Sequence, residues 1–226
     1  MYTLKETSIY EMQALKDLND LRLYLITDRA LFKEKKYFLT AVEAALRGGV
    51  KALQLREKDL SDSELIKLGI QLRRLTSNYK AKLIINSRAD IAKKIGADGV
   101  HLTEISIHAN AVKSSFPDLI VGVSTHSLEG AYLAEKQGAD YITFGPIYET
   151  PSKASYGPPK GLDSLRQVTQ AVRLPVLALG GITLHRVPDC LDQGAFGVAL
   201  ISDIWNSSNI KQHSFEYTQN FGGNTL

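Results

Sequence analysis

Residues Val50 to Asp59 read Val-Lys-Ala-Leu-Gln-Leu-Arg-Glu-Lys-Asp, an apolar run that ends in alternating charge. A buried strand has this pattern when it delivers polar side chains to a site at its tip. Because strand side chains alternate with period two, Gln54, Arg56 and Lys58 are predicted to share one face. An amide and two cations in a row indicate an anion site, whereas any one of them alone is typical of a solvated strand end.

Seven further apolar runs flank this stretch, and each is followed by a helical pattern. The predicted strands cover residues 21–27, 50–56, 82–86, 98–102, 119–124, 140–145, 175–179 and 196–202. The predicted helices between them cover residues 37–47, 61–75, 88–95, 106–115, 127–137, 161–172 and 184–193. Alternating strands and helices predict a parallel sheet, and eight such units predict an α/β fold closed into a (β/α)8 barrel of the TIM type.

A short internal repeat supports the barrel. Gly-Gly-Val at 48–50, Gly-Ala-Asp at 96–98 and 138–140, and Gly-Ala-Phe at 194–196 each end a helix and start an even-numbered strand. Glycine suits the left-handed cap at a helix end. The alternative is an open doubly wound sheet, but no G-x-G-x-x-G follows an early strand.

Length, charge and cysteine content restrict the class of protein. The 226 residues suit one barrel at 21–205, preceded by a helical extension at 1–20 with a helix over 8–19. The polar tail at 206–226 is expected to hold one short helix. A net charge of +3 is too small to indicate nucleic acid as a partner. Cys190 is the single cysteine, so no intrachain disulfide can form. No apolar run suits a membrane span or a signal peptide, and we therefore expect a cytoplasmic protein. A homodimer is left open.

Two anion sites are predicted at the barrel mouth, where the carboxyl ends of the strands meet. Gly180-Gly181 follows the seventh strand and Ile201-Ser202 the eighth, and their backbone N–H groups suit a phosphate. The second site is the row of Gln54, Arg56 and Lys58, with Asn86 and Lys153 in reach. A single phosphate does not need three cations, whereas a diphosphate carries roughly three negative charges.

A long loop at 148–157 and two histidines are the other candidates. The loop carries Thr150 and Lys153, and it is either a surface excursion or a lid that excludes water. His126, at the end of the fifth strand, suits proton transfer as well as it suits a plain hydrogen bond. His101, inside the fourth strand, is interpreted as structural. No cluster has zinc spacing, and Cys190 is expected to be inert.

These motifs resemble the thiamine-phosphate synthase/TenI family from about residue 21 to residue 202. The resemblance is carried by 25–28, 54–58, 85–86, 98–102, 122–126, 144–146 with Thr150 and Lys153, 179–182 and 197–199. It implies a synthase that couples a pyrimidine diphosphate to a thiazole phosphate and releases diphosphate, through a pyrimidine cation that the thiazole nitrogen captures. The residues it implies for the pyrimidine diphosphate are Gln54, Arg56, Lys58, Asn86, Ser124, Thr150 and Lys153; those for the thiazole phosphate are Gly181, Ile201 and Ser202. Such a site needs charge neutralisation more than a nucleophile.

The chain departs from the family pattern at two metal positions and at Thr103-Glu104, where the resemblance implies Gly-Gln after His-Leu. The resemblance implies two aspartates for Mg²⁺, and Ser87 and Ser106 stand in their places. Hydroxyls are weaker ligands than carboxylates, and Glu104 or Asp28 could supply the carboxylates in place of the missing aspartates. The TenI branch of the family is a metal-independent thiazole tautomerase that uses a histidine at the position of His126. Loss of both aspartates favours the tautomerase, and the retained diphosphate residues favour the synthase. We prefer the synthase, with the tautomerase or a degenerate thiazole-phosphate-binding regulator as alternatives.

Overall fold

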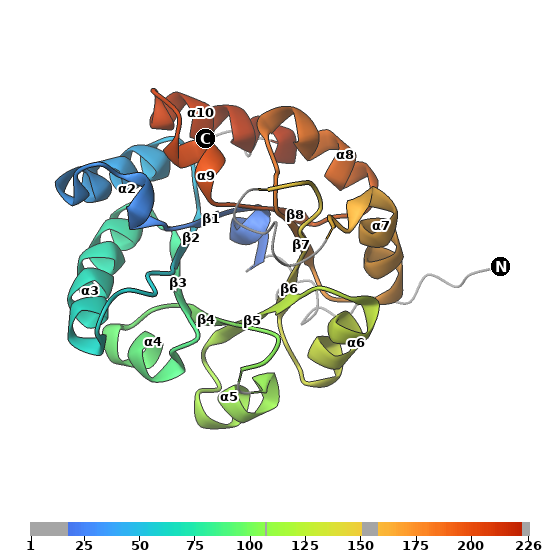
Figure 1. The fold of residues 1–226 in the computed structure, drawn as a ribbon. Coiled ribbons are helices and arrows are strands. Elements are labelled where there is room, and N and C mark those ends of the chain that lie inside the picture. Colours follow the sequence, from blue (N-terminus) through green and yellow to red (C-terminus); the bar gives the residue numbers. More distant parts are fainter. Residues whose placement is uncertain (1–17, 107, 151–157, 223–226) are drawn as a thin grey trace.

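The computed structural model describes residues 18–106, 108–150 and 158–222, which form a closed barrel of eight parallel strands in sequence order (Figure 1). The strands are β1 Leu23–Ile26, β2 Ala52–Leu55, β3 Lys82–Asn86, β4 Gly99–Leu102, β5 Ile120–Thr125, β6 Tyr141–Phe144, β7 Val176–Leu179 and β8 Gly197–Leu200. Pairing of β1 with β8, with Leu23 opposite Val198, closes the ring. The predicted (β/α)8 fold is confirmed.

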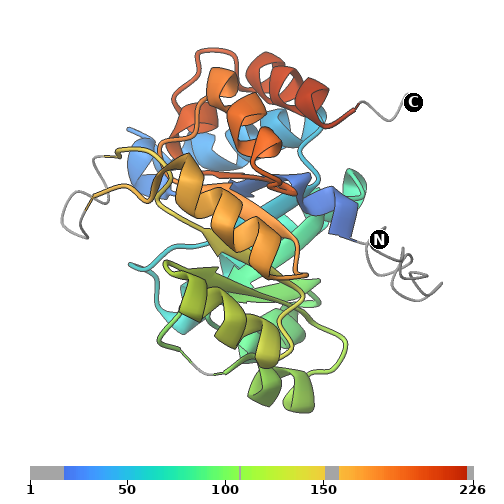
Figure 2. The ribbon, with the colours of Figure 1, turned by 90° about the vertical axis from the view of Figure 1, so that its right-hand side faces the viewer.

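Helices form the outer ring. They are α2 Phe38–Arg47, α3 Asp62–Asn78, α4 Ala89–Ile95, α5 Ala109–Ser115, α6 Leu128–Lys136, α7 Gly161–Ala171, α8 Val187–Asp192, α9 Ser202–Trp205 and α10 Ile210–Thr218. Short 3-10 turns add η1 Asn19–Arg22, η2 Arg29–Leu31, η3 Lys35–Tyr37, η5 Leu184–Arg186 and η6 Gln219–Phe221. α10 packs against α2 at the outside of the ring (Figures 1 and 2). No helix in the described ranges is long and apolar enough to cross a membrane.

Local chemistry sets where these elements begin and end. Ser61 and Glu64 form the predicted capping box at the start of α3, with the Ser61 amide 2.9 Å from a Glu64 carboxylate oxygen. The predicted helix over 106–115 starts only at Ala109, so the residues after β4 form a loop. The predicted strand over 50–56 is too long, because β2 ends at Leu55. Lys58 therefore lies in a turn, and the prediction that it continues one strand face with Gln54 is wrong.

Two apolar layers hold the barrel. Outward residues of the strands pack under the helices, whereas inward residues, among them Tyr24, Ile84, Tyr141 and Leu177, fill the barrel interior. Leu21 of η1 belongs to the same inner cluster, so this turn closes the amino-terminal end of the barrel. Figure 1 shows η1 in blue within the ring. Most of the predicted helix over 8–19 lies outside the described residues.

The aspartates of the Gly-Ala-Asp repeat have matching roles. Asp98 accepts a hydrogen bond from the Leu83 amide at 2.7 Å and pairs with Arg73 of α3. Asp140 accepts from the Val121 amide at 2.7 Å and pairs with Lys113 of α5. Each carboxylate thus joins the start of one strand to the start of the preceding strand and to a helix. The repeat stabilises the end of the barrel opposite the mouth.

Candidate active site

The floor of the mouth is polar. Gln54 on β2 is 1% exposed, and its Nε2 donates to Asn86 Oδ1 on β3 at 3.0 Å. Asn86 Nδ2 donates in turn to Ser87 Oγ at 3.1 Å. Gln54 Oε1 is buried and has no hydrogen-bond partner within the described residues. Because a buried acceptor without a partner is costly, this oxygen is suited to a donor brought by a ligand.

Two cations follow β2 without carboxylate partners. Arg56 is half-buried, and its amide donates to Thr27 Oγ1 at 2.9 Å; Lys58 is exposed. Neither forms an ion pair with any other described residue. Glu57 between them is instead paired with Arg29, at 3.2 Å. The positive charge of Arg56 and Lys58 therefore remains available to an anion. Lys153 lies outside the described residues, whereas Thr150 is described and half-buried.

The turn after β7 has the geometry of a phosphate loop. Gly180 and Gly181 have φ of 99° and 64°, which favours glycine. A side chain on Gly181 would collide with Tyr148 and with the backbone oxygen of Glu149. The amides of both glycines donate to no backbone oxygen in the described part of the chain. Backbone N–H groups exposed in this way suit an anion.

Arg186 stabilises this turn through its carbonyl. The sequence reasoning missed this residue. Its Nη1 donates to the Gly181 carbonyl oxygen at 2.6 Å. Its guanidinium carbon lies 4.4 Å from the centre of the Tyr148 ring, within the range of a cation–π contact. Burial raises the pKa of Tyr148 to about 12. An arginine five residues after a Gly-Gly turn was the only signal available in the sequence.

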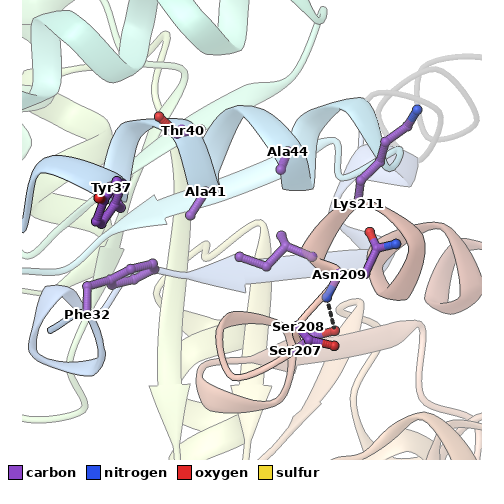
Figure 3. A pocket seen from close by; sticks show the side chains of 10 residues that line it. Phe32, Tyr37, Thr40, Ala41, Ala44, Ser207, Ser208, Asn209 and Lys211 are labelled. Carbon is purple, nitrogen blue, oxygen red and sulfur yellow. Dashed lines mark hydrogen bonds between the residues drawn. The ribbon is translucent and has the colours of Figure 1, made fainter. Parts of the chain in front are cut away.

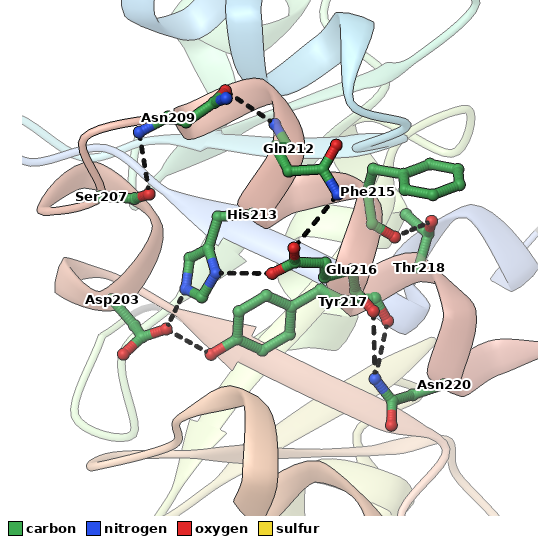
Figure 4. A network of polar contacts seen from close by, with 10 residues as sticks. All are labelled: Asp203, Ser207, Asn209, Gln212, His213, Phe215, Glu216, Tyr217, Thr218 and Asn220. Carbon is green, nitrogen blue, oxygen red and sulfur yellow. Dashed lines mark hydrogen bonds and ion pairs between the residues drawn. The ribbon is translucent and has the colours of Figure 1, made fainter.

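The turn after β8 is held by the C-terminal helix (Figure 4). Ser202 begins α9, and the next residue, Asp203, accepts hydrogen bonds from His213 Nε2 at 2.7 Å and from Tyr217 Oη at 2.6 Å. Both donors lie on α10. Burial and the bond to Asp203 raise the pKa of Tyr217. The sequence reasoning treated this segment as a polar tail and missed the network.

The two mouth histidines have different surroundings. His126 Nδ1 lies 2.6 Å from the Gly145 carbonyl oxygen. Since a carbonyl oxygen only accepts, Nδ1 carries a hydrogen, and in the neutral ring Nε2 is the acceptor. His101 is 3% exposed, with ring nitrogens 2.9 Å from Ser124 Oγ and 3.1 Å from Tyr141 Oη. Burial, with a smaller contribution from nearby Arg56, lowers the pKa of His101 to about 3, so the ring is neutral.

The positions that resemble magnesium ligands do not form a metal site. Ser106 Oγ donates to the Thr103 carbonyl at 2.8 Å, and Ser87 Oγ accepts from Asn86. Of the proposed substitutes, Asp28 caps η2 and Glu104 lies against Gly130 at the start of α6. No three His, Cys, Asp or Glu side chains of the described residues are grouped to hold a metal ion. Within the described residues, side chains alone therefore do not form a complete Mg²⁺ site, and such an ion would need further ligands such as substrate phosphates.

The structure also contains a cavity of about 390 Å³ (Figure 3). It is bounded by α2 and by the segment that leads into α10. The lining residues are Phe32, Tyr37, Thr40, Ala41, Ala44, Ser207, Ser208, Asn209, Ile210 and Lys211. None of them is a predicted substrate residue.

Comparison with known proteins gives one consistent family. The family model described as "Thiamine monophosphate synthase" matches residues 23–204. The chain is 51% identical over 181 residues to the putative thiamine-phosphate synthase 2 of Aquifex aeolicus, covering 80% of this chain and 96% of that protein. It is 38% identical to the thiamine-phosphate synthase of Pyrococcus abyssi, covering 87% and 92%. The solved thiamine phosphate pyrophosphorylase from Pyrococcus furiosus superposes with a TM-score of 0.82 at 35% identity, covering 90% of this chain and 96% of that one.

Proposed function

We propose that this chain, which belongs to the thiamine monophosphate synthase family, joins a hydroxymethylpyrimidine diphosphate to a thiazole phosphate and releases diphosphate. It is a transferase of the thiamine-phosphate pyrophosphorylase type. Two features of the described residues carry the assignment to this site: Arg56 and Lys58, which follow β2, pair with no carboxylate there, and Gln54 Oε1 on β2 is buried without a hydrogen-bond partner there.

The reaction needs a site that stabilises a leaving diphosphate. The bond between the pyrimidine methylene carbon and the diphosphate oxygen breaks, and its electron pair leaves with the diphosphate. The thiazole nitrogen then donates its lone pair to the methylene carbon, forming the C–N bond of thiamine phosphate. Arg56 and Lys58 offer positive charge to the departing group, since no carboxylate in the described residues neutralises them. Lys153 and Thr150 are proposed to complete this site from the long loop.

The pyrimidine ring is proposed to lie over the polar floor. The pyrimidine of thiamine carries an amino group, whose N–H bonds suit Gln54 Oε1. Asn86 fixes the other end of that amide at 3.0 Å, so its oxygen cannot turn away without losing a hydrogen bond. Ser124 lies on β5 at the same end of the barrel. This arrangement recognises the base while the cations hold its diphosphate.

The thiazole phosphate is proposed to bind across the turns after β7 and β8. The amides of Gly180 and Gly181 point to no backbone acceptor in the described ranges, and Ile201 and Ser202 lead into α9 beside them. Adjacent loops after the seventh and eighth strands commonly form the phosphate site of this fold. The two anion sites then lie on different sectors of one mouth, with the reacting atoms between them.

The test is a reconstituted reaction with purified protein, both substrates and added Mg²⁺. Thiamine phosphate and diphosphate should form in equal amounts, and omission of either substrate should stop both. Arg56→Gln should lower kcat/KM by roughly 10²-fold, because a charge that stabilises the leaving group is lost. Arg74→Gln, on the exposed side of α3, is the matched control and should keep wild-type activity. Absence of thiamine phosphate under all these conditions would refute the proposal.

A second candidate is the TenI-like thiazole tautomerase, which the geometry of His126 favours. Its Nδ1–H donates to Gly145 O, and no described residue bonds Nε2, which in the neutral ring is the nitrogen that can act as a base. Loss of deuterium from a labelled thiazole carboxylate phosphate, abolished by His126→Ala, would support the tautomerase. Binding of thiazole phosphate without either reaction would support a regulator.

A further inference from the structure

A chain of hydrogen bonds crosses the barrel interior below the mouth. Tyr141 Oη on β6 donates to Tyr24 Oη on β1 at 2.8 Å. Tyr141 Oη also lies 3.1 Å from His101 Nδ1, and His101 Nε2 lies 2.9 Å from Ser124 Oγ. Tyr24 and Tyr141 are 0% exposed, so their hydroxyls have no access to water. Gly122 makes room for the chain, because a side chain there would overlap Tyr141 and His101.

The direction of these bonds follows from the donors available. Tyr141 gives its only hydrogen to Tyr24, so toward His101 its oxygen can only accept. His101 Nδ1 must therefore carry the hydrogen. The ring is neutral, which leaves Nε2 without one, so Nε2 accepts from the Ser124 hydroxyl. Thr143 Oγ1, at 3.4 Å from Nε2, is the longer and weaker contact.

We propose that Tyr24, Tyr141 and His101 are positioning residues that hold the hydroxyl hydrogen of Ser124 inside the barrel, so that Ser124 presents only acceptor lone pairs to the substrate. The ligand group that matches is an N–H donor, as on an aminopyrimidine. Gln54 Oε1 offers a second buried acceptor at the same mouth. The proposal rests on the proposed function. It explains how residues that do not touch the pyrimidine ring contribute to its recognition.

The packing of the three rings makes the chain suited to this role. The centres of the Tyr24, Tyr141 and His101 rings lie 5.6 to 6.0 Å apart, in tilted contacts. Aromatic rings packed in this way inside a barrel have few alternative rotamers. Tyr141 and His101 each have one partner on each side, and a buried network of this kind resists reversal of a single bond. The orientation of Ser124 is thus determined by Tyr24, on the strand β1, across the barrel.

Tyr24→Phe tests this chain of hydrogen bonds, the relay from Tyr24 to Ser124, without altering a residue at the mouth. Tyr141 loses its acceptor and should then donate to His101 Nδ1, which moves the imidazole hydrogen to Nε2 and turns Ser124 into a donor. The ¹⁵N shifts of His101 should show a protonated Nδ1 and a bare Nε2 in the wild type, and the reverse in Tyr24→Phe. The KM for the pyrimidine diphosphate should rise roughly tenfold, while the KM for the thiazole phosphate stays unchanged. Tyr79→Phe, which removes a hydroxyl bonded to Glu43 outside the barrel, is the control.

The coupling to Ser124 separates this role from a structural one. In a Ser124→Ala background, Tyr24→Phe should add no further change in KM, because the hydroxyl that the relay orients is gone. Tyr141→Phe, which removes the acceptor of the Nδ1 hydrogen, is the second variant if Tyr24→Phe does not fold. A wild-type His101 protonated at Nε2, or equal effects of Tyr24→Phe with and without Ser124, would overturn the proposal. The ¹⁵N shifts can be measured without turnover. A protein without synthase activity would therefore refute the proposed function, while the shifts would still test the hydrogen-bonded chain separately.

Discussion

The buried imidazole of His101 makes the stability of the barrel depend on pH, and His101→Gln should remove that dependence. In the folded protein, burial first and the charge of Arg56 second lower the pKa of His101 to about 3, against an ordinary value of 6.5. The unfolded chain therefore binds a proton below pH 6.5 that the native state does not bind until about pH 3. A depressed native pKa means that stability is fully present above 6.5 and is lost as the pH falls toward 3.

The size of the effect follows from the two pKa values. Each unit of pH within this window costs about 1.4 kcal/mol per unmatched proton. The unfolded state begins to bind the proton near pH 6.5, which is about 1.5 pH units above pH 5. Between pH 8 and pH 5, His101 therefore accounts for about 2 kcal/mol of lost stability. A glutamine at this position has no proton to bind, and that share of the loss should vanish.

The measurement is urea-induced unfolding at pH 8, 6.5 and 5, followed by far-UV circular dichroism. His101→Gln lowers the absolute stability at every pH, so only the change with pH is compared. The wild type should lose about 2 kcal/mol more than the variant between pH 8 and pH 5. His185→Gln removes a surface histidine and controls for the change of residue type. An equal loss in the wild type and in His101→Gln would show that the native imidazole is not held neutral, and the reasoning would fail.

Three further outcomes are expected. Asp140→Asn weakens the hydrogen bond to β5 and the ion pair with Lys113, so the free energy of unfolding, measured by thermal melts, should fall by about 1–3 kcal/mol. Asp118→Asn, at an exposed ion pair, is the control and should change the free energy of unfolding by under about 0.5 kcal/mol. Arg186→Ala releases the carbonyl of the phosphate turn and should raise the KM for the thiazole phosphate roughly tenfold; an unchanged KM in steady-state assays would contradict its role. Ser87→Asp restores a carboxylate, and the Mg²⁺ concentration for half-maximal activity should fall roughly tenfold; an unmoved titration curve would show that this position does not limit metal binding.

The fold could be predicted because each of its eight units carries its own signal. An apolar strand, a turn and an amphipathic helix repeat along the chain, and the predicted strands overlap all eight observed ones. The site was predictable where it depends on strand ends, as for Gln54 and Asn86, which the register of β2 and β3 brings within 3.0 Å. Lys58 was misplaced because the strand stops at Leu55, and periodicity does not reveal where pairing ends.

Other features depend on contacts between distant segments, which no local pattern contains. Arg186 reaches the phosphate turn only because η5 folds back beside it, and its ring partner Tyr148 comes from the loop after β6. Asp203 meets His213 and Tyr217 only because α10 packs at the outer ring. A lone polar residue on a helix gives the same sequence signal whether it faces water or a partner. Such residues are found by the structure alone.

The distribution of charge at the mouth bears on how the diphosphate is held. Some described cations on the barrel are paired with carboxylates, as Arg88 is with Asp62 and Asp90, which raise the pKa of its guanidinium. Arg56 and Lys58 form no ion pair within the described residues, although an acidic residue lies between them in sequence. Glu57 is turned to Arg29 and is 4% exposed, so it is held away from the anion site. If Arg56 and Lys58 hold the diphosphate as proposed, charge-removing variants at these positions should raise the KM for the pyrimidine diphosphate more than the KM for the thiazole phosphate.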